Sequence, residues 1–230
     1  MRHRARITFR KYGDLRYIGH RDLIRVFERM LRRTGVGLAL SQGFHPKAKL
    51  SFPLALAVGI EGAQELLEVE FSEPIDVGAL AQLLKDECPP GLEVVKVRQL
   101  ALGEKKFQPT SIEYRMPVRQ NRQSAAQAAI SDFLAQDVYE IERPGRKKPI
   151  DARADIRVLE ITDGQLRIVQ RLTRTAAVQP REILEILNLG DLENEGAWLT
   201  RTSIDCESAD RDCRRESDDN LQHKKKENQT

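Results

Sequence analysis

The order of strand-like and helix-like segments in the first hundred residues is the feature that most constrains the fold. Residues 5–12 alternate apolar and polar side chains, and residues 20–34 repeat apolar side chains at helical spacing before Gly35. The remaining expected elements are strands at residues 36–40, 65–71 and 92–100 and a helix at residues 77–87. This βαββαβ order predicts a ferredoxin-like α+β unit over residues 1–102, with helices on one face of an antiparallel sheet.

A similar order of elements begins again after a linker. The expected strands are residues 111–118, 138–141, 156–162, 165–172 and 198–204, and the expected helices are residues 124–135 and 179–188. We therefore predict a second, degenerate ferredoxin-like unit over residues 103–204. Residues 205–230 are polar and poor in apolar side chains, which predicts a disordered tail.

Positive charge gathers near the N-terminus although the whole chain carries a formal net charge of only +3. Residues 1–50 contain 13 Lys and Arg against 3 Asp and Glu, whereas residues 51–100 contain 3 against 9. Four arginines of the expected first helix lie within about 80° of one another, opposite its apolar side. They are Arg21, Arg25, Arg29 and Arg32. This face predicts phosphate binding, and an ordinary solvated helix face is the alternative.

Two loops extend the basic character of the chain. The first contains Gly43 and Pro46 and would project His45, Lys47 and Lys49. The second contains Arg146, Lys147 and Lys148. Both loops are candidate contacts for an RNA backbone, with solvated turns as the alternative. Because only 5% of the residues are aromatic, an exposed stacking platform for bases is not obvious, and binding would rest on phosphate contacts.

His20 and His45 are the candidate catalytic residues, since a free imidazole titrates near neutral pH. A histidine that hydrogen-bonds within the fold is the alternative for His20. No metal site is predicted, because no carboxylate or thiol has a fixed spacing to the histidines. The chain is also predicted to bind no cofactor of its own: Cys88, Cys206 and Cys213 lack the spacing that holds an iron–sulfur cluster.

The stretch from RITFRKYGDLRYIGHRDLIRVFERMLRRTG through LALSQGFHPKAKLSF to LALAVGIEG and ELLEVEF resembles the radical-SAM-linked protein family. The resemblance covers roughly residues 1–190 and is most specific over residues 12–75. It implies a domain fused to, or encoded beside, a radical SAM protein, in the gene neighbourhood of a ribonuclease of the E/G type. Gly19 stands where family members often have Ser, and Ala48 where they often have Pro.

Together these observations predict an accessory module that binds RNA, such as tRNA or rRNA, and presents it to a radical SAM partner without catalysing a reaction itself. One alternative is a domain that docks on that partner without contacting RNA. Another is a metal-independent endoribonuclease that uses His20 and His45. Sparse cysteines, no signal-peptide pattern and no apolar run near the ~18 residues of a membrane span predict a cytoplasmic protein with no membrane contact.

Overall fold

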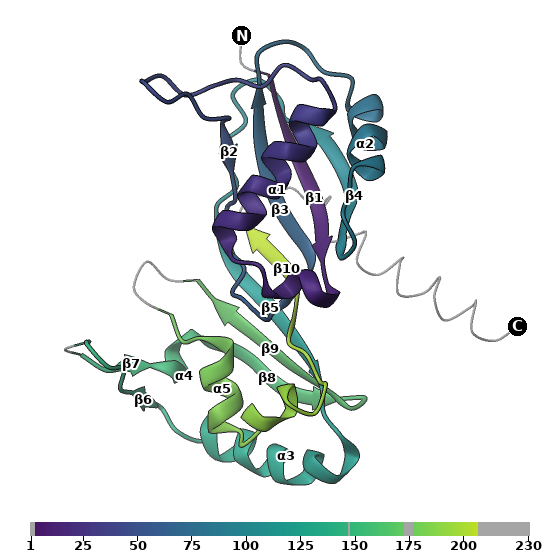
Figure 1. The fold of residues 1–230 in the computed structure, drawn as a ribbon. Coiled ribbons are helices and arrows are strands. Elements are labelled where there is room, and N and C mark those ends of the chain that lie inside the picture. Colours follow the sequence, from purple (N-terminus) through teal and green to yellow (C-terminus); the bar gives the residue numbers. More distant parts are fainter. Residues whose placement is uncertain (1–2, 147, 173–176, 207–230) are drawn as a thin grey trace, which may run out of the picture.

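The protein is a mixed α+β structure built on one eight-stranded sheet (Figure 1). A computed structural model describes residues 3–146, 148–172 and 177–206. The strands pair in the order β4-β1-β3-β10-β5-β9-β8, and β2 also pairs with β3. The predicted mixed α+β class is therefore confirmed.

The first half of the sheet is covered by two helices on one face (Figure 1). Its elements are β1 His3–Lys11, α1 His20–Arg33, β2 Leu50–Ser51, β3 Glu61–Phe71, α2 Val77–Asp86 and β4 Leu92–Gln99. β1 lies antiparallel between β3 and β4, and β2 is antiparallel to β3. Alternate side chains of β1, such as Ile7 and Phe9, pack with Leu23 and Phe27 of α1 in the first core.

The helix α1 forms because its apolar side chains recur on one side and its ends are defined. Leu23, Phe27, Met30 and Leu31 are buried. The helix follows Gly19 and ends at Arg33, and Gly35 adopts a positive φ of 74° directly after the C-cap residue Thr34. The predicted helix and its glycine stop are confirmed.

The second half of the sheet also alternates strands and helices along the chain. Its elements are β5 Pro109–Pro117, α3 Gln120–Leu134, β6 Glu140–Ile141, β7 Ile150–Asp151, α4 Ala152–Asp155, β8 Ile156–Thr162, β9 Gln165–Arg171, α5 Pro180–Ile186 and β10 Thr200–Cys206. β5 lies antiparallel between β9 and β10, and β8 is antiparallel to β9. A second core joins Ile130 and Phe133 of α3 with Ile183 and Leu184 of α5.

The two halves share the sheet through a short seam, which we define as the parallel pairing of β3 with β10. Only Thr200 with Glu61 and Arg201 with Gly62 pair across it. Just behind this pairing, the Arg201 guanidinium binds Glu65, and both residues are 2% exposed. A buried charge pair thus supplements a pairing that the backbone makes over only two residues.

Three local expectations need correction. Residues 36–40 do not form the expected strand; their β-pairing is limited to two isolated β-bridges, Leu38 with Phe71 and Leu40 with Ala48. Of the strand expected at residues 138–141, only the two-residue β6 forms, and it pairs with β7 in a separate small sheet. β10 continues through Cys206, past the expected end of the second unit. The rest of the expected tail lies outside the described residues.

Candidate nucleic-acid interface

The arginine face of α1, which comprises Arg21, Arg25, Arg29 and Arg32, is exposed at every position. Arg25 donates a 2.9 Å hydrogen bond to Asp22 one turn earlier. The other three arginines make no ion pair with any described residue. Their guanidinium groups are therefore available to an anionic ligand.

On the face of the sheet that α1 does not cover, several arginines form ion pairs with carboxylates. Arg4 and Arg6 donate to Glu68 at 2.8 and 2.9 Å. Burial would raise the pKa of Glu68, but the hydrogen bonds from Arg6, the Phe107 amide and Arg4 outweigh it and leave that pKa lowered. Charge on this part of the sheet is neutralised within the fold.

The second half of that face follows the same pattern. Arg167 donates to Glu113 at 3.0 Å and to Glu160 at 2.9 Å, and Arg115 donates to Glu113 at 2.7 Å. Burial opposes the ionisation of Glu113, yet hydrogen bonds from Arg115 and Arg167 outweigh it and lower its pKa. The arginine face of α1, where three of four guanidinium groups have no ion pair with a described residue, thus differs from these carboxylate-paired arginines of the sheet face.

The second basic element is an arm, which we define as residues 38–50. Figure 1 shows it projecting from the body at the end of the sheet where α1 also ends. His45 and Lys47 are exposed, whereas Lys49 Nζ lies 3.5 Å from Glu70 Oε2. The arm and the C-terminal end of α1 therefore bring basic groups to the same end of the molecule.

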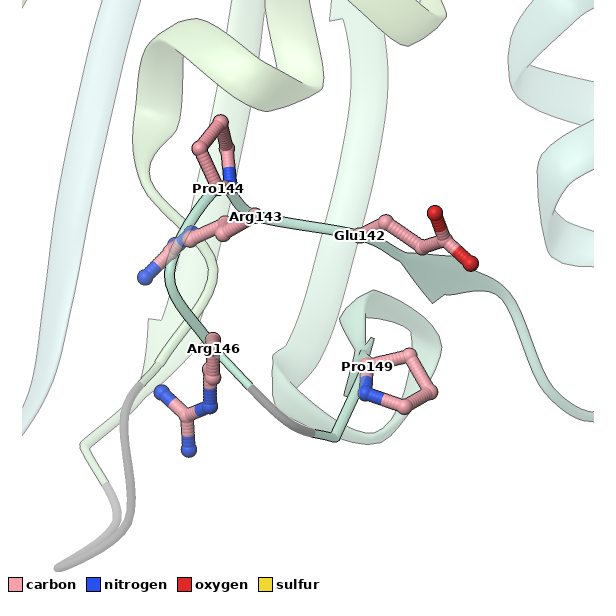
Figure 2. Close-up of a pocket in the computed structure, with 5 residues that line it drawn as sticks. All are labelled: Glu142, Arg143, Pro144, Arg146 and Pro149. Atoms are coloured by element: carbon pink, nitrogen blue, oxygen red, sulfur yellow. The ribbon is translucent and has the colours of Figure 1, made fainter.

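The second basic loop carries an open cavity of about 460 Å³, lined by Glu142, Arg143, Pro144, Arg146 and Pro149 (Figure 2). Arg143 donates to both carboxylate oxygens of Glu182, at 2.6 and 2.5 Å, and to Ala177 O at 3.0 Å. These bonds hold the loop against the start of α5. Arg146 and Lys148 are exposed, and Lys147 lies outside the described residues.

Figure 2 also shows how charge is distributed around this loop. The side chains of Arg143 and Arg146 extend to the same side of the loop, and the Glu142 carboxylate points away from them. Because Glu182 neutralises Arg143, the exposed positive charge here comes from Arg146 and Lys148. The loop belongs to the second half, so α1 and this loop occupy different halves of the sheet.

The two candidate catalytic histidines lie at opposite ends of α1. His20 is the first residue of the helix, and its ring packs edge-on against Phe52 with centroids 5.2 Å apart. The arm that carries His45 follows the other end of the helix, whose 14 residues span about 20 Å. The fold brings the two imidazoles into no common site. Within the described residues, no three His, Cys, Asp or Glu side chains gather as a metal site would require.

Sequence reasoning missed two groups of residues. The first is the buried polar cluster behind the seam: Lys11, Glu65, Tyr114 and Arg201. A signal for it existed, because Glu65 has the same strand parity as the buried Leu67 and Val69. Burial lowers the pKa of Lys11 and raises the pKa of Tyr114.

The second missed residue is Phe44, whose side chain is fully exposed at the tip of the arm. The sequence made no stacking platform obvious, and the structure leaves one aromatic ring fully exposed at this position. An aromatic residue between Gly43 and His45 in a polar loop was the available signal.

No helix within the described ranges has both the length and the apolar character needed to cross a bilayer.

Comparison with known proteins gives a family match and distant likenesses to solved structures. None of the curated proteins matches the chain. A crystal structure of an unknown protein from Galdieria sulphuraria is 10% identical, with a TM-score of 0.29 and coverage of 90% of this chain and 100% of that one. The crystal structure of a putative glycine cleavage system transcriptional repressor is 10% identical, with a TM-score of 0.26 and coverage of 86% and 96%. Neither likeness bears on function at such TM-scores.

The family match is more extensive, because it spans most of the folded part of the chain. It runs from residue 4 to residue 183, from β1 into α5. The chain belongs to the family described as "Uncharacterized protein conserved in bacteria (DUF2344)".

Proposed function

We propose that this protein is a non-catalytic accessory module that binds RNA through the arginine face of α1 and the arm, and presents it to a radical SAM enzyme. One observation carries the RNA-binding part. Arg21, Arg29 and Arg32 are exposed without a carboxylate partner among residues 3–146, 148–172 and 177–206, whereas Arg4, Arg6 and Arg167 on the sheet face are paired with carboxylates. Unpaired guanidinium groups on one helix face suit the phosphate oxygens of a nucleic acid.

The radical SAM enzyme enters as the proposed partner on the strength of the sequence resemblance. This chain lacks the closely spaced cysteines that hold the cluster of such enzymes, so the partner would supply the cluster and the chemistry. The separation of His20 from His45 favours a binding role over cleavage by this histidine pair.

We further infer that the two halves are ferredoxin-like units of the same topology. In the first half the strand order is β4-β1-β3-β2, and in the second it is β10-β5-β9-β8. Each order places the fourth strand beside the first and the third beside the second, with all neighbours antiparallel. That correspondence supports a duplicated βαββαβ arrangement whose two sheets join at the seam.

An RNA titration with charge-reversal variants tests the proposed binding face. The test variant is Arg21→Glu with Arg29→Glu, which adds acids to the arginine face. The matched control is Arg157→Glu with Arg171→Glu, since these exposed arginines of β8 and β9 also make no ion pair with described residues. Both double variants change the net charge equally.

At low salt, we expect wild type and control to shift total cellular RNA in a gel, and the arginine-face variant to bind much more weakly. Unchanged thermal unfolding would show that both variants fold. Equal weakening by the two double variants would mean that only net charge matters, and would contradict the proposed site. If RNA is not bound, but the arginine-face variant no longer co-purifies with the radical SAM protein, the face docks protein instead.

A further inference from the structure

The tip of the arm presents an aromatic ring to solvent. Phe44 has a relative exposure of 102%, whereas the next most exposed large apolar side chain in the described parts of the chain, Leu102, has 76%. Every other phenylalanine with a described side chain is buried or partly buried. A ring held entirely in water gains no burial free energy within this chain, and both of its faces are open to a contact with another molecule.

The backbone of the arm holds this ring away from the body. Ser41 N donates to Lys47 O at 2.8 Å, and Lys47 N donates to Ser41 Oγ at 3.0 Å, which closes the tip. At its base, Ala39 N donates to Glu70 O at 2.9 Å and Glu70 N to Lys49 O at 3.1 Å, so the arm continues the hydrogen bonding of β3. Gly43 has a φ of 137°, which favours glycine and turns the chain just before the ring.

The charged residues near Phe44 in the sequence indicate what kind of ligand the arm would bind. Residues 29–60 contain no Asp or Glu at all. His45 and Lys47 beside the ring are exposed, and the nearest acidic side chain bound to the arm, Glu70, faces Lys49 at its base. An exposed ring in a segment that carries Lys47 and no Asp or Glu matches a ligand that has both flat apolar faces and negative charge. A nucleotide in a single strand has both.

We propose that the arm binds an unpaired nucleobase of RNA, which stacks on Phe44 while Lys47 contacts a neighbouring phosphate. The inference rests on the proposed function and sharpens it, because it makes single-stranded loops, bulges or ends the preferred substrate. Bases within a duplex already stack on one another and leave no face for the ring. The arginine face of α1 would then contact phosphates on either side, without distinguishing single from double strands.

Two RNA probes and three substitutions at one position test this inference. The probes are a single-stranded oligoadenylate and a fully paired RNA hairpin stem, titrated at the same low salt by fluorescence anisotropy. The substitutions are Phe44→Ala, Phe44→Leu and Phe44→Trp. Since the side chain touches no core, each variant should fold, and circular dichroism checks this.

We expect Phe44→Ala and Phe44→Leu to bind the single strand about tenfold more weakly, and Phe44→Trp to bind it as wild type does. Binding of the paired stem should not change in any variant. Equal affinity of wild type and Phe44→Ala for the single strand would overturn the inference while leaving RNA binding intact. Absence of binding by wild type to either probe would overturn the proposed function as well. If Phe44→Ala no longer co-purified with the radical SAM protein but still bound RNA, the ring would be assigned to a protein pocket, and the inference would also be overturned.

Discussion

Replacing Arg201 with Met should reveal how strongly the buried ion pair holds the seam. The Arg201 guanidinium donates to Glu65 Oε1 at 2.8 Å and also binds Glu65 Oε2. It donates further to Ala55 O at 3.0 Å and to Leu54 O at 3.2 Å. One side chain therefore ties β10 to β3 and to the loop before β3.

The expected cost follows from what Arg201→Met leaves behind. The Glu65 carboxylate would remain in a site where it is 2% exposed and would keep only Lys11 as a nearby cation. Breaking a buried pair by removing one partner costs about 3–5 kcal/mol. A domain has about 5–15 kcal/mol of total stability, so this loss would be a large fraction of it. Because methionine is of similar length and apolar, little of the loss would come from a cavity.

Urea unfolding followed by circular dichroism measures this change as a lower transition midpoint at unchanged slope. The control is the double variant Glu65→Leu with Arg201→Met, which removes both charges. We expect it to be more stable than Arg201→Met alone, because the Glu65 carboxylate no longer stays buried without its guanidinium partner. A loss below about 1 kcal/mol for the single variant would refute the reasoning. So would a double variant that is no more stable than the single one.

Three further perturbations test the fold. Glu68 has a lowered pKa in the folded state, so its contribution to folding stability is complete above its unfolded-state pKa and is lost as the pH falls. We therefore expect Tm to decrease below about pH 4, and to decrease less steeply in Glu68→Gln. Phe27→Ala should cost about 3–5 kcal/mol in urea unfolding, since the ring is fully buried against Phe9 and Phe52. Gly91→Ala should destabilise more than Gly35→Ala: both glycines have positive φ, but a Cβ at Gly91 would lie 2.6 Å from Tyr12 O, and one at Gly35 meets nothing. Equal losses for the two glycine variants, or an acid transition that Glu68→Gln leaves unchanged, would contradict these accounts.

Periodic segments were the predictable part of this fold. The apolar positions of α1 and the alternation in β1 and β3 identify their elements because each pattern is local and long. The two-residue strands β2, β6 and β7 are too short to carry a period, and residues 36–40 bridge to neighbours without forming a strand.

Contacts between distant residues were not predictable. The contact of Glu65 with Arg201 joins positions 136 residues apart, and the pairing of β3 with β10 joins similarly distant parts of the sequence. No local pattern specifies such partners. The exposure of Phe44 depends likewise on an arm whose direction is set by hydrogen bonds to β3. By contrast, the exposure of the arginine face follows from helical periodicity once the apolar side of α1 is known.

The salt dependence of RNA affinity tests the central claim most directly. Each phosphate contact of a single strand contributes about 0.7 to the slope of log K against log salt concentration. If Arg21 and Arg29 each contact a phosphate, Arg21→Glu with Arg29→Glu should lower the slope by about 1.4, and Arg157→Glu with Arg171→Glu should leave it unchanged. The same slope for wild type and the arginine-face variant would contradict the claim that this face binds RNA.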